Sequence, residues 1–393
     1  RARGPPRRGG PFSGPRRLAA RFRVIAVVPD APWADPDGLL DGVEVVRYRY
    51  APRRLQTLVN DGGIVANLKR SPWKWLLVPG FLVGQYLAAR RVIRRYHVDI
   101  IHAHWLLPQG LLACRLSRRF GVSFVVTSHG GDLFGLRGRL LTALKRKVAG
   151  VCAAMTVVST AMGDEVKRLG LKPRHLEVLP MGVNLQDRFV PDSRQHRTSD
   201  TLLFVGRLVP KKGLRYLLDA MPILLAKHPE AVLRIVGFGP DETALKRQAE
   251  VLTLGTHVQF YGPAAQQELP ALYRGAAVFV APFVRDVNGD QEGLPVALTE
   301  AMGCECPVVV GNVDGIHDLL GDAAASVAVQ PQDVEALAAA ILTTLDHPLE
   351  ASKQARTMRA AVSARMDWVH IAGRYTDILG ACIGQQSEIG DGS

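Results

Sequence analysis

The sequence predicts an α/β protein made of two doubly wound domains, each a parallel sheet with helices on both faces. Three observations support this prediction. Short, apolar, β-branched runs recur with helical patterns between them, as in successive β-α-β units. The recurrence stops at residues 180–200, a polar stretch with two prolines, and then restarts. A chain of 393 residues is also too long for one ordinary core.

The first half contains five runs that we expect to be strands of a parallel sheet. They are "FRVIAVV" (22–28), "VDIIHAH" (98–104), "SFVVTSH" (123–129), "MTVVS" (155–159) and "LEVLP" (176–180).

The second half contains six further runs. They are "TLLFVG" (201–206), "AVLRIVG" (231–237), "HVQFYG" (257–262), "VFVAP" (278–282), "PVVVG" (307–311) and "SVAVQ" (326–330). We therefore expect domains at residues 1–185 and 186–368, then a last helix at 369–383 and a frayed tail. Ligands of such sheets bind at the carboxyl ends of strands, so chemistry is expected there, in a cleft between the domains.

The net charge of +13 comes mostly from the start of the chain, where eight arginines precede residue 24 without any acid. The remainder is only mildly basic and contains no nucleic-acid-binding motif. We therefore expect no nucleic-acid partner.

The five cysteines are odd in number and lie mostly in apolar contexts, as expected for buried, reduced thiols. Cys304 and Cys306 lack a second pair of ligands, so no metal site is expected. No apolar segment of signal-peptide type precedes residue 24, which favours a cytoplasmic protein.

The longest apolar run, Trp75 to Ala89, is interrupted by Pro79, Gly80 and Gly84 and is too short to span a bilayer. Together with Trp73 it is compatible with a site for a lipid-linked acceptor, but a buried helix of the first domain is the favoured interpretation. Two basic clusters allow contact with an anionic membrane, but a solvated helix face is the favoured interpretation. They are Arg90, Arg91, Arg94 and Arg95, and Lys145, Arg146 and Lys147.

The stretch "LLFVGRLVPKKGLRYLLDAM" leads from a strand through a basic loop into an amphipathic helix. Arg207 and Lys212 supply two cations, and Gly213 permits close backbone approach. Two cations beside a helix N-terminus suit a diphosphate, because the free N–H groups and the helix dipole both favour negative charge. A solvated loop remains the alternative for this stretch taken alone.

A second turn, Gly237-Phe238-Gly239, follows the next strand and resembles an incomplete G-x-G-x-x-G in which Glu242 replaces the third glycine. Such a fragment is weak evidence for NAD. A tight strand-to-helix turn lining a nucleotide is the better interpretation.

The stretch "GDQEGLPVALTEAMG" (289–303) places Glu292 and Glu300 on either side of a helix start at Gly293, Leu294 and Pro295. Counted as helix, the eight-residue interval puts both acids on one side, about 12 Å apart along the axis. That separation suits two hydroxyl-rich parts of one extended ligand and exceeds that of a retaining glycosidase pair. A structural acid at Glu300 is the alternative.

Three histidines lie at expected strand ends. His129 precedes Gly130 and Gly131 and is expected to face a ligand. His102 and His104 lack a third metal ligand, so we assign them to the cleft wall or to packing.

These stretches resemble the family-four glycosyltransferases of GT-B fold, bacterial enzymes with two Rossmann-like domains that move a sugar from a nucleotide donor to a cell-envelope acceptor. The resemblance spans roughly residues 98–320. It rests on "HAHWLLPQG", "TSHGGD", "LPMGVN", "FVGRLVPKKG", "VGFGP", "EGLPVALTEAMG" and "GNVDGIHDLL". The terminal "DWVHIAGRYTDIL" resembles the helix with which the family crosses back to the first domain.

The resemblance implies that catalysis depends on His129, Glu292, Arg207 and Lys212. Arg207 and Lys212 would hold the diphosphate, Glu300 the ribose, and Glu292 the donor sugar. The donor site as a whole would comprise Gly206, Arg207, Lys212, Gly237, Gly239, Glu292, Gly293, Leu294, Pro295 and Glu300. The leaving diphosphate would be stabilised while the sugar becomes oxocarbenium-like.

The implied activity is transfer with retention of configuration, without metal or cofactor, at the inner face of the plasma membrane. The implied partners are a nucleotide-sugar donor and a lipid-linked or saccharide acceptor. A non-catalytic nucleotide-sugar-binding protein is the alternative, followed by a GT-B phosphorylase or epimerase. An NAD-dependent dehydrogenase is the weakest interpretation.

The start of the chain departs from the family pattern. The family begins with a strand, a glycine-rich loop and a long helix, but "RARGPPRRGGPFSGPRRLAA" occupies that place. Either the first strand is missing or aberrant, or the loop is rebuilt from "GGPFSG". A missing central strand would expose apolar edges, and this departure is the reason for the non-catalytic alternative.

Overall fold

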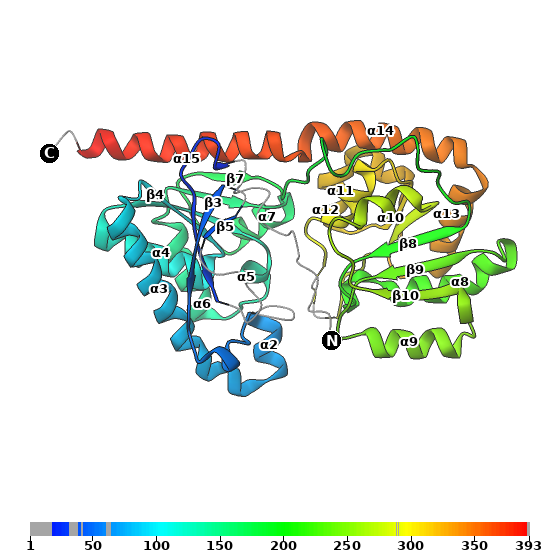
Figure 1. Ribbon diagram of the computed structural model, residues 1–393, viewed down its shortest axis with the longest axis horizontal. Coiled ribbons are helices and arrows are strands. Elements are labelled where there is room, and N and C mark those ends of the chain that lie inside the picture. The colour runs from blue at the N-terminus through cyan, green and yellow to red at the C-terminus, as the bar shows by residue number, and fades with distance from the viewer. Residues whose placement is uncertain are drawn as a thin grey trace. The chain divides into compact units, whose positions relative to one another are not determined.

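A computed structural model describes residues 18–30, 38–40, 42–59, 64–287, 289 and 291–390 (Figure 1). The described chain forms two compact units. The C-terminal unit comprises Met181–Ile371, and the N-terminal unit comprises the described residues up to Pro180 together with the chain from Ala372. The stretch "GGPFSG" lies outside the described residues.

The C-terminal unit contains a six-stranded parallel sheet in the order β10-β9-β8-β11-β12-β13. Its strands are β8 (Thr201–Val205), β9 (Val232–Val236), β10 (Val258–Gly262), β11 (Val278–Ala281), β12 (Val308–Gly311) and β13 (Ala328–Val329). Its helices are α8 (Leu214–Lys227), α9 (Glu242–Val251), α10 (Leu269–Gly275), α11 (Val296–Gly303), α12 (Asp314–Leu320), α13 (Val334–Asp346) and α14 (Pro348–Met366).

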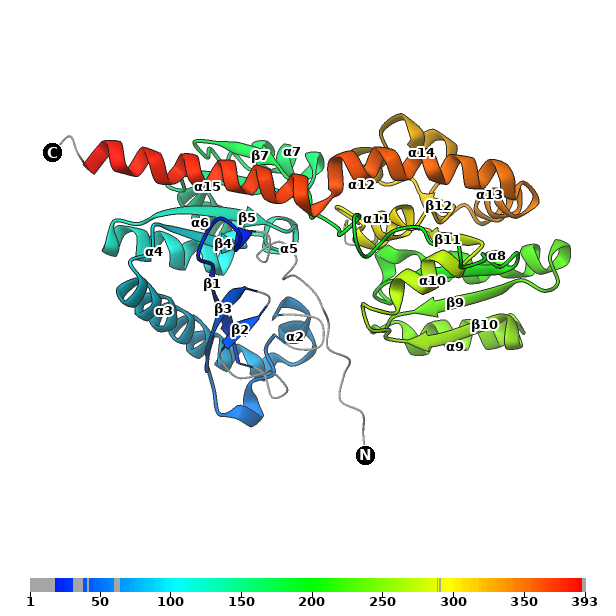
Figure 2. The same ribbon diagram turned by 45° about the horizontal axis from the view of Figure 1, so that its top comes forward.

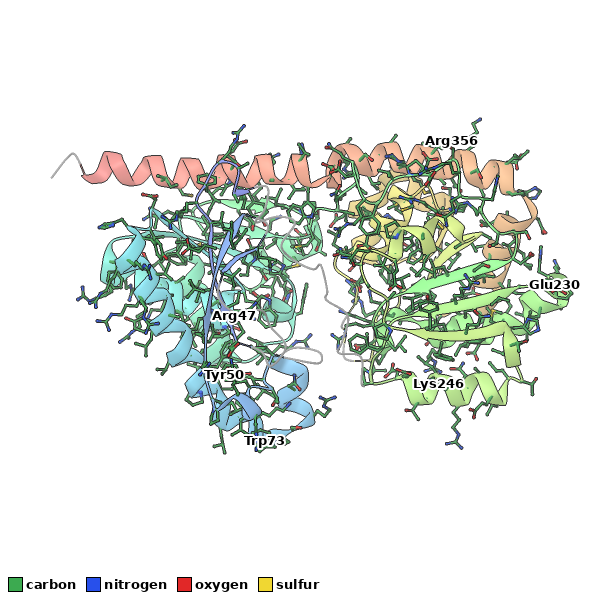
Figure 3. All side chains as sticks on the ribbon, viewed as in Figure 1. Arg47, Tyr50, Trp73, Glu230, Lys246 and Arg356 are labelled. Atoms are coloured by element: carbon green, nitrogen blue, oxygen red, sulfur yellow. The ribbon has the colours of Figure 1, made fainter. Side chains whose placement is uncertain are left out.

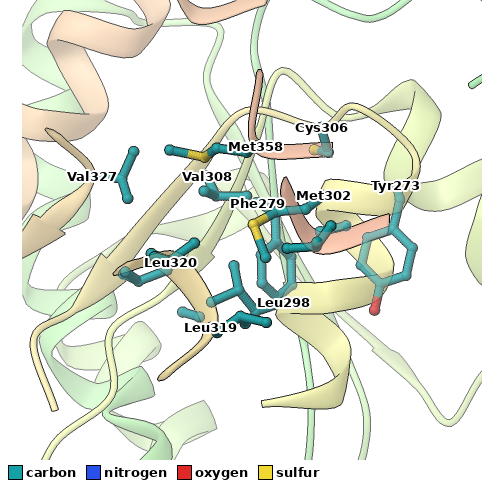
Figure 4. Packing of buried hydrophobic residues seen from close by; sticks show 14 of the residues in the cluster. Tyr273, Phe279, Leu298, Met302, Cys306, Val308, Leu319, Leu320, Val327 and Met358 are labelled. Atoms are coloured by element: carbon teal, nitrogen blue, oxygen red, sulfur yellow. The ribbon is translucent and has the colours of Figure 1, made fainter. Parts of the chain in front are cut away.

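Alternate residues of the central strands enter two separate cores, which explains why the strands are continuously apolar. Leu202 and Phe204 of β8 pack with α8, α9 and α13 on one face of the sheet. Leu203 of β8 and Phe279 of β11 pack with α11, α12 and α14 on the other face (Figure 4). Helices therefore cover both faces of this sheet, as predicted.

The polar linker packs onto the second of these cores. Leu185 and Phe189 are buried there, and the N–H of Val183 donates to the carbonyl of Met366 at 2.8 Å. The division between the units therefore falls after Pro180, five residues before the boundary expected from the sequence.

The N-terminal unit contains two sheets. One has the order β1-β3-β2, formed by β1 (Ile25–Pro29), β2 (Gly38–Leu40) and β3 (Val43–Tyr48), with β1 parallel and β2 antiparallel to β3. The other is parallel, with the order β4-β5-β6-β7, formed by β4 (Ile100–His104), β5 (Ser123–Ser128), β6 (Ala154–Val157) and β7 (Leu176–Val178). Figure 2 separates the two groups of strands.

The helices of the N-terminal unit include the long α3 (Leu77–Tyr96), which follows α2 (Ile64–Arg70) and the 3-10 turn η2 (Pro72–Leu76). The others are α4 (Leu111–Phe120), α5 (Gly131–Phe134), α6 (Arg139–Ala149) and α7 (Thr160–Arg168). In the described part of the chain no strand joins β1 to β4. Every residue of β1 is half-exposed, whereas the first four residues of β8 are buried.

All eleven strands expected from the sequence are confirmed. The missed β3 reads "VEVVRY", with Val43, Val45 and Tyr48 buried. Glu44 and Arg47 interrupt its apolar residues, so it is not a continuous β-branched run of the kind that marks the other strands.

The last helix, α15, runs from Trp368 to Gly390 and is longer than expected. The tail that follows residue 383 begins with "GQQSE", whose Gln and Glu are good helix formers, so the prediction of fraying there was wrong. The Tyr375 hydroxyl lies 3.4 Å from the hydroxyls of both Thr127 and Thr156, so α15 is already held to the N-terminal unit within its first half.

Two expectations about surface residues were wrong. Lys145 is buried, and its ammonium donates to the carbonyls of Leu133 and Leu136 at 2.9 and 2.7 Å, so it is not a membrane contact. The apolar run after Trp75 is not wholly buried, because α3 buries only one of its faces.

Candidate functional site

The loop after β8 carries the two expected cations. It passes through the 3-10 turn η4 (Pro210–Lys212) and enters α8 after Gly213, whose φ is +67°. A Cβ at Gly213 would lie 1.7 Å from the carbonyl oxygen of Pro282, which follows β11. The loop therefore requires glycine because it touches the backbone beyond the neighbouring strand.

The glycines after β9 serve the same kind of contact. A Cβ at Gly237 would lie 1.8 Å from the oxygen of Gly206, and one at Gly239 would lie 2.2 Å from the oxygen of Leu208. The N–H of Leu208 also donates to the carbonyl of Phe238 at 3.0 Å. Gly237 and Gly239 thus allow the loops after β8 and β9 to pack backbone against backbone. This packing accounts for glycine at both positions, so the two glycines are not evidence for a bound dinucleotide.

Lys212 and Glu292 form an ion pair between the loops after β8 and β11. Nζ of Lys212 lies 2.7 Å from Oε2 of Glu292, and only 14% of each side chain is exposed. The contact is an ion pair without the geometry of a hydrogen bond. Oε2 of Glu292 is buried and accepts no hydrogen bond from the residues that the structure describes. The Lys212 ammonium also lies 4.9 Å from the ring centre of Phe283, whereas Arg207 is exposed.

The prediction that Glu292 and Glu300 share a helical face was wrong. Helix α11 begins at Val296, and Pro295 precedes it with φ of −82° in an extended conformation. Glu292 therefore lies in the loop, where helical spacing does not apply. The start of α12 supports this loop, because a Cβ at Gly315 would lie 2.2 Å from the oxygen of Gly293.

Gly293 itself has open space where a side chain would lie, and Leu294 packs into the core. The backbone of this short segment therefore separates an open side, at Gly293, from a buried side, at Leu294.

Glu300 is buried within α11. Its Oε2 accepts a hydrogen bond from the Tyr273 hydroxyl at 2.9 Å. Burial raises the pKa of Glu300 to about 7, opposed by the Tyr273 hydrogen bond and the charge of Arg188. Sequence reasoning missed Tyr273, which looks like an ordinary core residue of an apolar helix.

In the N-terminal unit, His129 follows β5 and meets His104 at the end of β4. His104 Nδ1 lies 2.9 Å from His129 Nε2, and the two rings stack with centres 5.2 Å apart. The ring centre of His102 lies 4.4 Å from that of His104, with the two rings tilted by 32°, and His102 Nε2 lies 2.7 Å from the Thr127 hydroxyl. The three histidines therefore form one cluster, which alternation along β4 and β5 did not reveal.

Burial lowers the pKa values of His104 and His129 to about 4, although part of the His104 ring is exposed. Burial and the two neighbouring imidazoles lower the pKa of His102 well below its usual value. All three rings are therefore neutral near pH 7, and one proton is shared between His104 and His129.

Asp132 holds the turn that carries His129. It is fully buried, and its oxygens accept from the N–H of Leu106 at 2.6 Å, the Ser128 hydroxyl at 2.9 Å and the His129 N–H at 3.2 Å. The motif "TSHGGD" contains this residue, but nothing in its spacing indicates a role for Asp132.

The predicted residues thus fall into two groups. Those of the C-terminal unit, except Glu300, lie in the loops that follow three neighbouring strands, β9, β8 and β11, at the carboxyl edge of the sheet. His129 lies at the equivalent edge of a sheet in the N-terminal unit. Among the described residues, no group of three His, Cys, Asp or Glu side chains is arranged to hold a metal ion. The five cysteines are all buried and free, as expected.

Comparison with known families gives two matches that together cover nearly the whole chain. Residues 16–187 match the model described as Glycosyltransferase Family 4, and residues 186–362 match Glycosyl transferases group 1. The junction of the two matches lies within the linker.

Two relatives are GDP-mannose-dependent α-(1-6)-phosphatidylinositol monomannoside mannosyltransferases. The protein from Mycolicibacterium smegmatis is 30% identical over 302 residues, covering 74% of this chain and 78% of the relative. The protein from Mycobacterium tuberculosis is 28% identical and covers 95% of both chains.

Among solved structures, sucrose-phosphate synthase from Thermosynechococcus elongatus has a TM-score of 0.77 at 21% identity, covering 95% of this chain and 92% of that one. Anabaena Alr3699/HepE in complex with UDP-glucose has a TM-score of 0.67 at 17% identity, covering 91% of this chain and 99% of that one. At these identities the likeness concerns the fold.

Proposed function

Because the chain belongs to glycosyltransferase family 4 and has the GT-B fold, we propose that it moves a hexose from a nucleoside-diphosphate sugar to a lipid-linked or saccharide acceptor. We propose further that the transfer retains the anomeric configuration and needs neither a metal nor a cofactor.

One observation carries the proposal most directly: Lys212 and Glu292 meet at the carboxyl ends of two neighbouring strands, β8 and β11, and Arg207 lies in the same loop as Lys212. Arg207, Lys212 and Glu292 come from two loops that touch through Gly213 and Pro282. A diphosphate here would be held by Arg207, Lys212 and the N–H groups at the start of α11. These groups would stabilise the charge that develops as the glycosidic bond to phosphate breaks.

The two acids are proposed to bind hydroxyl groups of the donor. Glu292, with the backbone of Gly293 and Leu294, would accept hydrogen bonds from the sugar, and Glu300 from the ribose. A carboxylate held in a loop or a core can hydrogen-bond a sugar hydroxyl more strongly than a neutral acceptor would. His129 is proposed to contact the sugar as a neutral imidazole, consistent with its lowered pKa.

The acceptor is proposed to be a membrane or envelope component at the cytoplasmic face of the plasma membrane. Two relatives support this choice, since both are named as phosphatidylinositol monomannoside mannosyltransferases. The proposal covers both guanine and uracil nucleotides, because those relatives are named for GDP-mannose and the Anabaena structure holds UDP-glucose.

The test is a donor panel that includes GDP-mannose and UDP-glucose, assayed with envelope lipid extract and with glycan acceptors. We expect one donor to raise the melting temperature and to release nucleoside diphosphate in the presence of acceptor and EDTA, with the anomeric configuration retained by NMR. Glu300→Ala should lose the thermal shift.

The separation of β1 from β4 in the described chain favours one alternative, a protein that binds the donor without transferring it. A donor-induced thermal shift with no product from any acceptor would establish that alternative. A shift with NAD and none with UDP or GDP would overturn both.

A further inference from the structure

The exposed face of η2 and α3 is apolar where a surface helix is normally polar. Five large side chains are exposed there: Trp73 (49%), Trp75 (61%), Leu76 (81%), Val83 (57%) and Leu87 (47%). Figure 3 shows Trp73 at the periphery of its unit. Contiguous apolar surface of this kind marks an interaction site.

These side chains continue into a basic end. Leu76, Val83 and Leu87 are spaced by seven and four residues, and Arg91 and Arg94 follow at four and three. This spacing keeps all five on one helical face, over about 27 Å of axis. We call this set, together with Trp73 and Trp75, the α3 stripe.

The other face of α3 is fixed to the body of the unit. Leu77, Phe81, Ala88 and Val92 are buried. Gly84 allows the helix to lie directly on the chain after β3, since a Cβ there would lie 2.8 Å from the oxygen of Arg49. The α3 stripe therefore points away from the packed core.

The arginines of the stripe are available to an external anion. Arg91 and Arg94 are exposed, and no ion pair joins either to an acid within the described ranges. Arg94 instead lies over the ring of Phe120, at 5.9 Å.

We propose that the α3 stripe docks on a phospholipid bilayer that contains anionic headgroups. Tryptophans and leucines would enter the boundary between headgroups and acyl chains, and the arginines would contact lipid phosphates. A bilayer explains both ends of the stripe, because a purely apolar protein partner would leave Arg91 and Arg94 without counter-charges.

The stripe lies on the bilayer and does not cross it. The segment Pro72–Tyr96 is long and apolar enough to span a membrane by length and composition, with 28% of its most apolar window buried. The packed face of α3 forms part of the core of the N-terminal unit, however. Insertion of the whole helix into a bilayer would remove Leu77 and Phe81 from that core and lose their packing.

The test measures binding of the full chain to vesicles, so its failure is distinguishable from failure of the proposed transfer. Vesicles of phosphatidylcholine mixed with phosphatidylglycerol are compared with phosphatidylcholine alone, by co-sedimentation and by tryptophan fluorescence. We expect binding to the mixed vesicles, a blue shift of the emission and weaker binding at high salt.

Two variants test the two ends of the stripe. Leu76→Asp/Leu87→Asp should weaken binding at least about tenfold, because two charges oppose insertion. Arg91→Glu/Arg94→Glu should weaken binding to the mixed vesicles by about the same factor. The matched controls are Leu349→Asp, at an 81% exposed site of α14, and Arg356→Glu on the same helix, labelled in Figure 3. Both controls should bind like the unmodified chain.

Three outcomes would overturn the proposal. The first is no binding to mixed vesicles, and the second is binding that the stripe variants leave unchanged while their melting temperatures match the parent. The third is a dimer in sedimentation velocity that Leu76→Asp/Leu87→Asp dissociates, which would make the stripe an interface between copies of the chain.

Discussion

Nζ of Lys212 lies 2.7 Å from Oε2 of Glu292, so two groups proposed to hold opposite parts of one donor neutralise each other's charge. The pair keeps both side chains in place near the carboxyl edge of the sheet, at the cost of occupying each other's binding positions. A diphosphate would compete with Glu292 for the ammonium, and a sugar hydroxyl would compete with Lys212 for the carboxylate.

The first prediction concerns this pair. Lys212→Met should lower kcat/KM for the donor about a hundredfold, because one cation facing the leaving diphosphate is lost. Glu292→Gln should also lower kcat, since the amide accepts a sugar hydroxyl more weakly. Steady-state kinetics with Lys227→Met as the control, an exposed lysine at the end of α8, check this. A loss of activity that merely follows the melting temperature of each variant would assign the pair a structural role.

The second prediction concerns the proton on Glu300. Its raised pKa, about 7, leaves the carboxyl partly protonated near neutral pH. Ribose hydroxyls that donate to it would favour the ionised form, so donor binding should release a fraction of a proton at pH 6 to 7 and tighten as pH rises. Calorimetric titration in buffers of different ionisation enthalpy measures this release. Release that persists in Glu300→Gln would mean that another group is responsible.

The third prediction compares two glycines with positive φ. Gly213→Ala meets the oxygen of Pro282 at 1.7 Å, whereas Gly255→Ala, at φ of +51°, has nothing within 4 Å. The Gly255 change should cost about 1 kcal/mol of unfolding free energy, from backbone strain alone. The Gly213 change should cost several times more, or leave a chain that does not bind donor. Urea unfolding of both variants provides the comparison, and equal midpoints would contradict the close approach of the two loops.

Much of the fold follows from local sequence pattern, because buried parallel strands are continuous apolar runs with a strong signal. The local pattern does not predict the relative positions of side chains that depend on tertiary contacts. Pro295 lies before α11, so the spacing of Glu292 and Glu300 depends on the path of a loop. Tyr273 is distant in sequence from its partner Glu300, and the hydrogen bond between them exists only because α10 packs on α11.

The histidine cluster shows the same limit. His104 and His129 were each placed at a strand end, but their contact requires that β4 and β5 be neighbours in register. A single sequence contains no information on that register beyond the order of the strands. The glycines after β8 and β9 were assigned to phosphate binding and turns, and the structure adds the backbone contacts between loops that require them.

The fourth prediction is that pH acts on the two units in opposite directions. His129 has a folded pKa of about 4, below the usual 6.5, so its contribution to stability is complete above pH 6.5 and is lost as pH falls toward 4. Protonation of both His104 and His129 would also place two N–H groups against each other across the 2.9 Å contact. The exposed ring of His104 should add less, since solvent screens it.

Glu300 behaves in the opposite way. Its folded pKa of about 7 lies above the usual 4.5, so its protonated form stabilises the C-terminal unit at low pH. That stability is lost as pH rises from about 4.5 to about 7, by an amount on the order of 3 kcal/mol. Scanning calorimetry at several pH values checks both effects. His129→Asn should remove part of the decline below pH 6.5, and Glu300→Gln should remove the decline toward pH 7, each without altering the other. Either variant could instead change both the loss of stability below pH 6.5 and the loss toward pH 7. The two sites would then be coupled in one cooperative unit, and the assignment of each loss to a separate residue would be wrong.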